Sequence, residues 1–276
     1  MPELPEVETT RRTLAPLMEG RQFVKVDIRR PRMTRRNERP EDVVDRLVGR
    51  RLNHLGRIGK FMVGEVEGDI TLIMHLGMSG KFQIKAVGDP EDKHTNVVFS
   101  TDRNEEIRLV DPRTFGFVAA HTPDELDHSS IGDLGPDALD ALPGAPVLFD
   151  RMAGRKIAVK TLLLDQRFLA GLGNIYADEV LARAKVRGDR LAGGLTFDEV
   201  KAIRSSIGPV LKAGLKYGGT SLDDLAYLLP DGRAGEYTRR LQVYGREGDD
   251  CRICGTPISR TVLGGRSSFW CPACQT

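Results

Sequence analysis

The feature that most constrains this chain is a set of four cysteines near its end, Cys251, Cys254, Cys271 and Cys274. They follow the pattern C-x2-C-x16-C-x2-C, which is typical of a tetrahedral zinc site because each tight turn offers two thiolates. Four protein ligands close the coordination sphere, so the sequence predicts one structural Zn²⁺ and no catalytic metal. Two disulfides are the alternative, but the chain shows no secretory signal and is too long to need such cross-links.

The segment between the two cysteine pairs predicts a β-hairpin that turns at Gly264 and Gly265. Arg266 would then be presented beside the turn. Phe269 and Trp270 are expected to pack beneath the strands. A unit this small cannot fold by core burial alone, so zinc would supply its stability.

Length and composition predict a folded protein with no membrane span. The 276 residues fit one large domain or two ordinary ones, and 40% are hydrophobic against 29% charged. The chain holds no stretch of about 18 apolar residues, the length that a spanning helix needs. MPELPEVETT at the start has no basic residue and no apolar run, so we expect no signal peptide and a cytoplasmic protein.

Charge is small in total but segregated along the chain. The sum of 41 basic and 39 acidic residues is +2, which argues against a histone-like polycation. Residues Arg29–Arg39 nevertheless carry +5 and Arg151–Arg167 carry +4, whereas 122–140 contains six acidic residues and no Lys or Arg. Each basic run could be a solvated face, but together they favour a surface that binds a polyanion.

The hydrophobic pattern changes from strands to helices near the middle of the chain. A helix is predicted over 5–18, with Pro5 at its first position, a bend at Pro16 and Gly20 at its end. Short apolar runs predict strands at 22–28, 61–66, 70–76, 81–87, 96–100 and 107–110. Helical patterns follow at 150–152, 161–164, 175–185, 197–217 and 221–229.

These patterns predict an α+β fold in four parts. An N-terminal β-sandwich domain with an N-terminal helix covers 1–132, and a linker rich in Pro, Gly and Asp covers 133–150. A helical domain covers 151–241. The zinc finger covers 242–276.

The first residues, Met-Pro-Glu, allow a chemical interpretation. Loss of Met1 would leave Pro2 with a free secondary amine, and an α-amine is far less basic than a lysine. Such an amine can attack an aldehyde-level carbon and form an iminium ion, which promotes elimination. Glu3 stands beside it for acid–base work. Many chains begin in this way without any catalytic purpose, so these residues alone decide little.

Six separated segments together give a specific signal. They are MPELPEVET at the start, GRIGKF at 56–61, HLGMSG at 75–80, DPRTFG at 111–116, GLGNIYADEVL at 171–181 and the four cysteines. In this order the chain resembles the bacterial formamidopyrimidine-DNA glycosylase family over essentially its full length. The resemblance implies a helix-two-turn-helix in the helical domain, and a monomer that binds double-stranded DNA in a cleft between two domains. The DNA would carry oxidised purines or abasic sites.

The resemblance also implies roles for single residues. Pro2, Glu3, Lys60 and Arg266 would be catalytic. Met78, Arg113 and Phe115 would fill the space left by a flipped base, and Arg113 would read an orphaned cytosine. Asn174 would bind phosphate at the start of a helix. Further contacts to DNA or the lesion would come from His94, Lys156 and Lys160.

The predicted activity is that of a bifunctional DNA glycosylase and abasic-site lyase in base excision repair. It would excise 8-oxoguanine opposite cytosine and formamidopyrimidines, then cleave the strand by β,δ-elimination without magnesium. One alternative is an endonuclease VIII-like glycosylase for oxidised pyrimidines. Another is a noncatalytic zinc-finger protein that binds damaged DNA. The sequence assigns no role to the run Arg29–Arg39, and no base contact to residues 218–240, the place of the family's lesion-capping loop.

Overall fold

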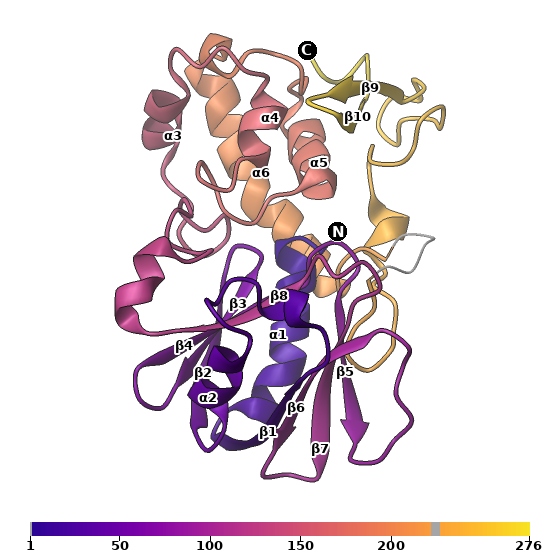
Figure 1. Cartoon of the computed structure of the whole chain (residues 1–276). Helices are drawn as coiled ribbons and strands as arrows, with labels where there is room; N and C mark the ends of the chain where they lie inside the picture. Colours follow the sequence, from indigo (N-terminus) through magenta and orange to yellow (C-terminus); the bar gives the residue numbers. More distant parts are fainter. Residues whose placement is uncertain (1, 222–226) are drawn as a thin grey trace. The chain divides into compact units, whose positions relative to one another are not determined.

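The N-terminal half folds because short β-branched and apolar runs, separated by Gly and Asp turns, pair in antiparallel register. In the computed structural model, which describes residues 2–221 and 227–276, these runs form an eight-stranded sheet in the order β5-β7-β6-β1-β2-β3-β4-β8 (Figure 1). The strands are β1 Arg21–Ile28, β2 Arg51–Ile58, β3 Phe61–Val66, β4 Ile70–His75, β5 Lys81–Ala86, β6 Thr95–Thr101, β7 Glu105–Val110 and β8 Phe117–His121.

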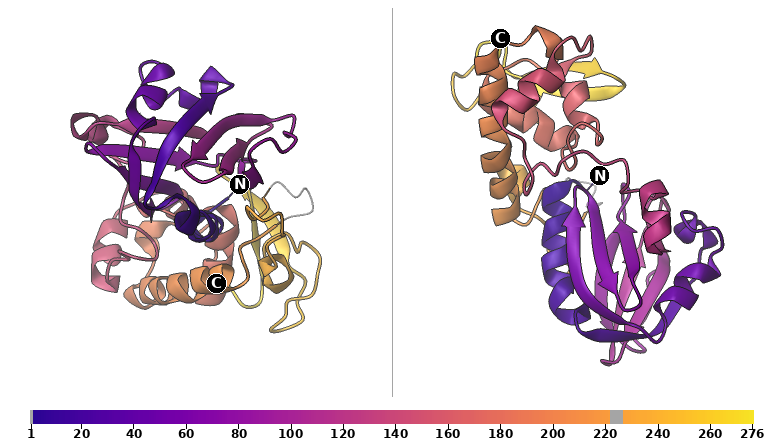
Figure 2. Two further views of the ribbon diagram at one scale, coloured as in Figure 1. Left: turned by 90° about the horizontal axis from the view of Figure 1, so that it is seen from below. Right: turned by 90° about the vertical axis from the view of Figure 1, so that its left-hand side faces the viewer.

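Strand β1 joins two halves of this sheet. Its residues Arg21 and Gln22 pair with β2, and from Phe23 onward it pairs with β6. Buried side chains from both halves share one core, for example Leu72 on β4 and Phe99 on β6. Helix α1 (Leu4–Met18) lies along the sheet and adds its apolar side to this core (Figure 2). Two sheet halves that enclose one core are the arrangement expected of a sandwich.

The remaining helical elements alternate with loops. Helix α2 and the short 3-10 helices η1 and η2 belong to the N-terminal half, and α3 to α6 and η3 follow. The 3-10 helix η4 precedes the zinc hairpin, the name used here for residues 251–276. Their bounds are η1 Pro31–Thr34, α2 Glu41–Leu47, η2 Pro123–His128, α3 Ala145–Met152, α4 Val159–Leu164, α5 Asn174–Ala184, η3 Ala192–Gly194, α6 Phe197–Lys216 and η4 Tyr237–Arg240. Strands β9 (Ser259–Leu263) and β10 (Arg266–Trp270) form a separate antiparallel pair.

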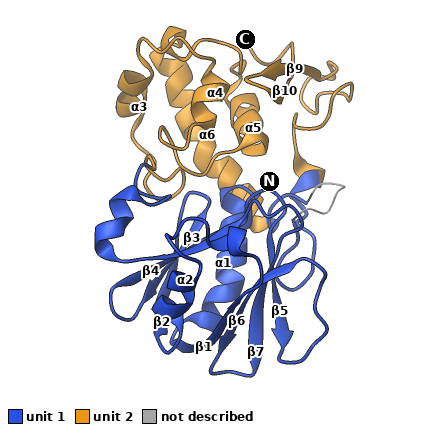
Figure 3. Cartoon of the chain, viewed as in Figure 1, with its two compact units in different colours: residues 1–133, 217–238 blue, residues 134–216, 239–276 orange. Residues whose placement is uncertain are grey.

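Two compact units divide the chain (Figure 3). Unit 1 contains residues 1–133 and 217–238, and unit 2 contains 134–216 and 239–276. The segment after α6 thus belongs with the β domain, whereas the sequence assigned it to the helical domain. The reason is long-range: the backbone N–H of Thr220 donates to the Glu6 carboxylate at 2.7 Å.

The predicted fold class is confirmed, and several elements differ in detail. The sequence pattern missed β2, in which polar residues interrupt the apolar ones, the five-residue strand β8 and the seven-residue helix α2. Helix α3 begins inside the expected linker. The helix predicted at 221–229 does not form at Ser221 or 227–229, and residues 222–226 lie outside the described part. None of the described helices combines the length and apolar character needed to cross a membrane.

Candidate functional site

Pro2 and Glu3 are buried at the first turn of α1. Glu3 is the N-cap, and its backbone N–H donates to the Glu6 carboxylate at 2.8 Å, which is half of a capping box. The other carboxylate oxygen of Glu6 accepts the N–H of Thr220. Gly219 has a φ of +84°, and a Cβ there would lie 2.7 Å from that oxygen. Glu6 therefore holds both the start of the helix and the segment that follows α6.

Lys60 occupies the tight turn between β2 and β3, and its exposed fraction is only 5%. Arg57 donates to the carbonyl of Gly59 in this turn at 3.0 Å and forms an ion pair with Glu8 on α1 at 3.3 Å. Burial alone would raise the pKa of Glu8, but hydrogen bonds and charges, first among them from Arg11, hold it below its ordinary value. The Glu8 carboxylate thus fastens the Lys60 turn to the helix that carries Glu3.

Residues 75–80 and 111–116, here termed the paired loops, present three of the predicted DNA contacts. Met78 is 38% exposed and Phe115 is 41% exposed, so both lie at the surface rather than in the core. The guanidinium of Arg113 lies over the Phe115 ring, 4.8 Å from its centre. The arrangement is an apolar wedge with a flat hydrogen-bond donor stacked upon it.

A single buried carboxylate, Asp111, connects the paired loops. It accepts hydrogen bonds from the Ser79 hydroxyl and the Gly116 N–H, each at 2.7 Å. Gly77 has a φ of +63°, and a Cβ there would lie 2.4 Å from the Gly116 nitrogen, so only glycine permits this approach. The half-buried His94 joins through its carbonyl, which accepts the Asp111 N–H at 3.0 Å.

His75 heads the first paired loop, and the sequence pattern assigned it no role. Its ring lies between Phe61, at a centroid distance of 4.7 Å, and Phe117, at 5.5 Å. Burial, followed by the charge of Lys60, lowers the pKa of His75 to about 4, so the ring is neutral at pH 7. Its Nδ1 accepts the Gly77 N–H at 3.1 Å, which assigns the proton to Nε2. Its place at the start of the segment HLGMSG could have marked it as a candidate site residue.

In unit 2, Asn174 is the first residue of α5, and the carbonyl of Ser267 on β10 accepts from its amide at 3.1 Å. Arg266 precedes Ser267 and is exposed at the hairpin turn, where Gly264 and Gly265 have φ of +54° and +75°. The predicted hairpin is confirmed. Arg266 is therefore the neighbour in the chain of Ser267, which contacts Asn174 at the start of α5. Lys156 is exposed in the loop before α4.

Lys160, which the resemblance predicts to contact DNA or the lesion, is enclosed in this structure. Its side chain is 1% exposed, forms an ion pair with Asp178 at 2.8 Å and donates to the Ser267 carbonyl at 2.7 Å. Burial raises the pKa of Asp178 to about 6 against the opposing effect of Lys160. Asp178 also accepts the N–H of Phe269 at 3.0 Å. An amine this enclosed cannot meet a phosphate without leaving its ion pair, so in this conformation it fastens β10 to α5.

The four cysteines gather as the spacing predicts. Their sulfur atoms lie within 4.8 Å of one another, and Cys254 is 3.5 Å from Cys271 and 3.4 Å from Cys274. Four sulfurs at about 2.3 Å from one tetrahedral zinc would be about 3.8 Å apart, whereas a disulfide needs about 2.0 Å. A hydrogen bond to Cys254 raises the pKa of Cys274 to about 12, and the four thiols can ionise together only with a cation between them. The site fits one structural zinc ion.

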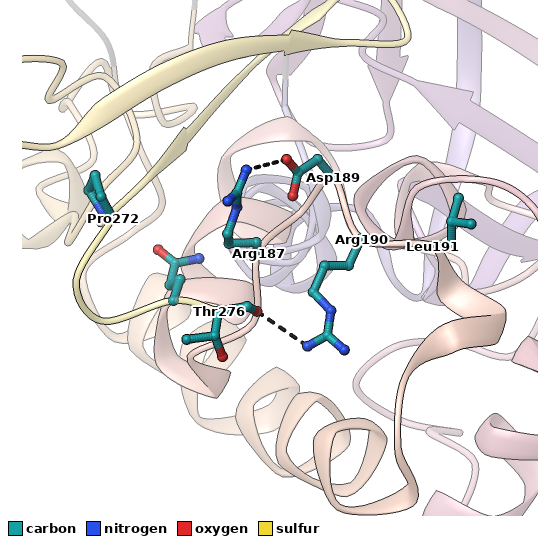
Figure 4. Close-up of a pocket in the computed structure, with 7 residues that line it drawn as sticks. Arg187, Asp189, Arg190, Leu191, Pro272 and Thr276 are labelled. Carbon is teal, nitrogen blue, oxygen red and sulfur yellow. Dashed lines mark hydrogen bonds and ion pairs between the residues drawn. The ribbon is translucent and has the colours of Figure 1, made fainter.

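A pocket of about 570 Å³ lies between the loop after α5 and the last residues of unit 2 (Figure 4). Its charged side chains are already paired: Arg187 with Asp189, and Arg190 with the carbonyl of Thr276 and with Glu199. Arg187 also lies over the Trp270 ring, 4.1 Å from its centre. The side chains that line the pocket thus serve contacts within unit 2, and we assign the pocket no chemistry.

Comparison with known proteins agrees with this geometry. Family models match the formamidopyrimidine-DNA glycosylase N-terminal domain over 1–118, the formamidopyrimidine-DNA glycosylase H2TH domain over 134–225, and a zinc finger found in FPG and IleRS over 248–276. The formamidopyrimidine-DNA glycosylase of Desulforamulus reducens is 40% identical over 100% of this chain and 99% of its own, and that of Heliobacterium modesticaldum is 42% identical over the whole of both.

Solved structures give the same result. The Lactococcus lactis Fpg in complex with DNA that contains an abasic site has a TM-score of 0.91 at 30% identity, with both chains covered completely. The MutM (Fpg) protein of Thermus thermophilus has a TM-score of 0.88 at 38% identity, over 99% of this chain and 98% of that one. By sequence along its whole length and by fold, the chain belongs to the formamidopyrimidine-DNA glycosylase family, whose members are DNA repair glycosylases with a zinc finger.

Proposed function

We propose that this glycosylase is bifunctional, and that it removes 8-oxoguanine opposite cytosine and formamidopyrimidines and then cleaves the strand as an abasic-site lyase. The observation that carries the proposal is the buried start of α1, where Pro2 directly precedes the N-cap Glu3 and the Glu3 N–H donates to the Glu6 carboxylate. A nucleophile at a fixed helix start has little freedom to lose on reaction, which favours attack on a bound sugar.

In the proposed reaction, removal of Met1 frees the secondary amine of Pro2. The Pro2 nitrogen forms a bond to the sugar C1′, and the bond from C1′ to the damaged base breaks. Glu3 transfers protons as the sugar ring opens and the iminium forms. β-Elimination then breaks the C3′–O bond and δ-elimination the C5′–O bond, which leaves phosphate at both ends of the gap.

The proposed DNA contacts use the groups already described. Met78, Arg113 and Phe115 would fill the space of the flipped base, and the Arg113 guanidinium would donate to an orphaned cytosine. Lys60, and Arg266 on the zinc hairpin, would assist the two eliminations. Asn174 at the start of α5 would bind phosphate, and further contacts to DNA or the lesion would come from His94 and Lys156. We propose a positioning role for Lys160, through Ser267, in place of a direct contact.

Borohydride trapping tests the mechanism. A duplex with 8-oxoguanine opposite cytosine should give a covalent complex, and peptide mapping should place the bond on Pro2. The Pro2→Ala variant has its free α-amine, now a primary one, at position 2 only if Met1 is removed, so mass spectrometry of each mature N-terminus belongs with the experiment. A complex mapped to a lysine, or a wild-type chain that retains Met1 and is still active, would refute the role of Pro2.

Substrate comparison separates the lesion classes. Excision of 8-oxoguanine should exceed excision of thymine glycol under equal conditions. The reverse preference would indicate an enzyme for oxidised pyrimidines, and binding to both lesions without release of either base would indicate a noncatalytic protein.

A further inference from the structure

The basic run Arg29–Arg39 has no place in the proposed chemistry, and its members differ in what they contact. Arg29 forms an ion pair with Asp27 at 3.4 Å, and Arg39 pairs with Asp42 at 2.7 Å. The charges of these two arginines are thus balanced by acidic side chains nearby in sequence. Arg35, in contrast, directs its hydrogen bonds to backbone carbonyls, and two of these belong to a loop about 80 residues away in sequence.

The Arg35 guanidinium spans two successive peptide groups of the paired loops. Its Nη1 donates to the Gly116 carbonyl at 2.7 Å, and its Nη2 donates to the Phe115 carbonyl at 2.8 Å. Nη1 also donates to the Arg32 carbonyl at 2.8 Å, and the same group lies over the Phe117 ring, 5.3 Å from its centre. Only a planar fork of donors can hold two carbonyls and a ring face at once.

The loop that Arg35 holds carries backbone strain. Thr114, between Arg113 and Phe115, has a φ of +52°, a conformation that β-branched residues rarely adopt. Such a conformation persists only where several interactions with the surrounding structure hold the backbone in it. In this loop, the Asp111 carboxylate accepts the backbone N–H groups of Arg113, at 3.2 Å, and of Gly116. Arg35 donates to the backbone carbonyls of Phe115 and Gly116.

We propose that Arg35 is a positioning residue for the wedge of Arg113 and Phe115. It acts by holding their loop in the strained form that exposes the Phe115 ring with the Arg113 guanidinium stacked on it. The inference rests on the proposed function, since the wedge matters only to an enzyme that flips a base out of a duplex. A displacement of about 1 Å at such a wedge is enough to cost a large factor in rate.

Two substitutions that conserve charge separate positioning from simple attraction to phosphate. Arg35→Lys keeps the positive charge but has one ammonium in place of the fork. Arg36→Lys is the matched control, because Arg36 is the next residue and also lies over Phe117, at 5.5 Å, yet no hydrogen bond from it to the paired loops is recorded in the described residues. Thermal unfolding should show that both variants fold.

The first readout needs no catalysis. A duplex with 2-aminopurine opposite a tetrahydrofuran abasic analogue reports wedge insertion as a change in fluorescence. We expect Arg35→Lys to reduce this change at saturating protein toward the level of Phe115→Ala, and Arg36→Lys to match the wild type. A full signal from Arg35→Lys, or an equal loss from both lysine variants, would overturn the proposal. The fluorescence change can be measured whether or not the wild type releases 8-oxoguanine. A failure of the proposed function would appear in the release assay and not in this one.

The second readout is the effect on activity. Arg35→Lys should lower kcat/KM on 8-oxoguanine duplexes by about tenfold and narrow the preference for cytosine over adenine opposite the lesion, as loss of a positioned donor does. Cleavage of a single-stranded abasic oligonucleotide, which has no opposite base, should stay within about twofold of wild type. An equal loss on both substrates would contradict a role through the wedge.

Discussion

The zinc hairpin (residues 251–276) and the paired loops both present candidate DNA contacts, yet they are held by different forces. Next to the hairpin, a charged pair is buried, because the side chains of Lys160 and Asp178 are each 1% exposed. The four cysteine sulfur atoms also cluster there. The paired loops follow strands of the eight-stranded sheet. Hydrogen bonds to the buried carboxylate of Asp111 join the two loops, and the exposed Arg35 donates to the Gly116 carbonyl.

The difference follows from how much core each region has. A two-stranded hairpin buries too little apolar surface to be stable by itself, so metal and buried ion pairs must supply the rest. The paired loops stand on strands whose core is already complete, so local hydrogen bonds suffice to fix them. We therefore expect perturbations of the hairpin to act on folding and perturbations of the paired loops to act on geometry.

Loss of zinc is the strongest way to test this difference. Cys271→Ser, or removal of the metal with a chelator, should unfold the hairpin and lower affinity for a lesion duplex by at least about 100-fold, because the phosphate contacts of Arg266 and its neighbours are lost together. Circular dichroism and a binding titration measure the two effects. Zinc added back should restore the chelated wild type. Full duplex affinity in the metal-free protein would show that the hairpin folds without its ion.

Removal of the buried amine should have the next largest effect. Lys160→Met leaves the Asp178 carboxylate enclosed without its counter-charge, and we expect the free energy of unfolding to fall by about 3–5 kcal/mol. Denaturant titration measures the change.

The matched control is an ion pair of the other unit at the surface. Lys25 pairs with Asp27 at 3.7 Å and its side chain is 70% exposed, so Lys25→Met should cost about 1 kcal/mol or less. Equal losses in the two variants would show that burial of the Lys160 pair does not determine its importance.

The paired loops should respond to pH through His75. The pKa of this ring is lowered from 6.5 to about 4, so between these values the folded protein binds fewer protons than the unfolded chain. The free energy of unfolding should therefore fall as pH falls from 6.5 toward 4, by up to about 3 kcal/mol from this residue. His75→Gln, which cannot titrate, should lose stability less steeply over the same range. Parallel pH profiles for variant and wild type would contradict the assignment.

Much of the candidate site was predictable from local sequence, and the failures share a cause. The cysteine spacing gave the metal site, and the Gly264–Gly265 pair gave the hairpin, because both depend on residues close along the chain. The enclosure of Lys160 was not predictable, because its environment is made by Asp178 and Ser267, which lie on other elements. No local pattern reports such burial.

The sequence by itself determined the order of the parts, the zinc ligands and the hairpin turn at Gly264 and Gly265, since spacing and glycine placement act within a few residues. Only the tertiary structure decided that the segment after α6 joins unit 1 through Glu6, that Lys160 is enclosed and that Arg35 reaches the carbonyls of Phe115 and Gly116. The physical reason is that burial and hydrogen-bond partners depend on which distant segments meet, and that depends on the packing of the whole domain.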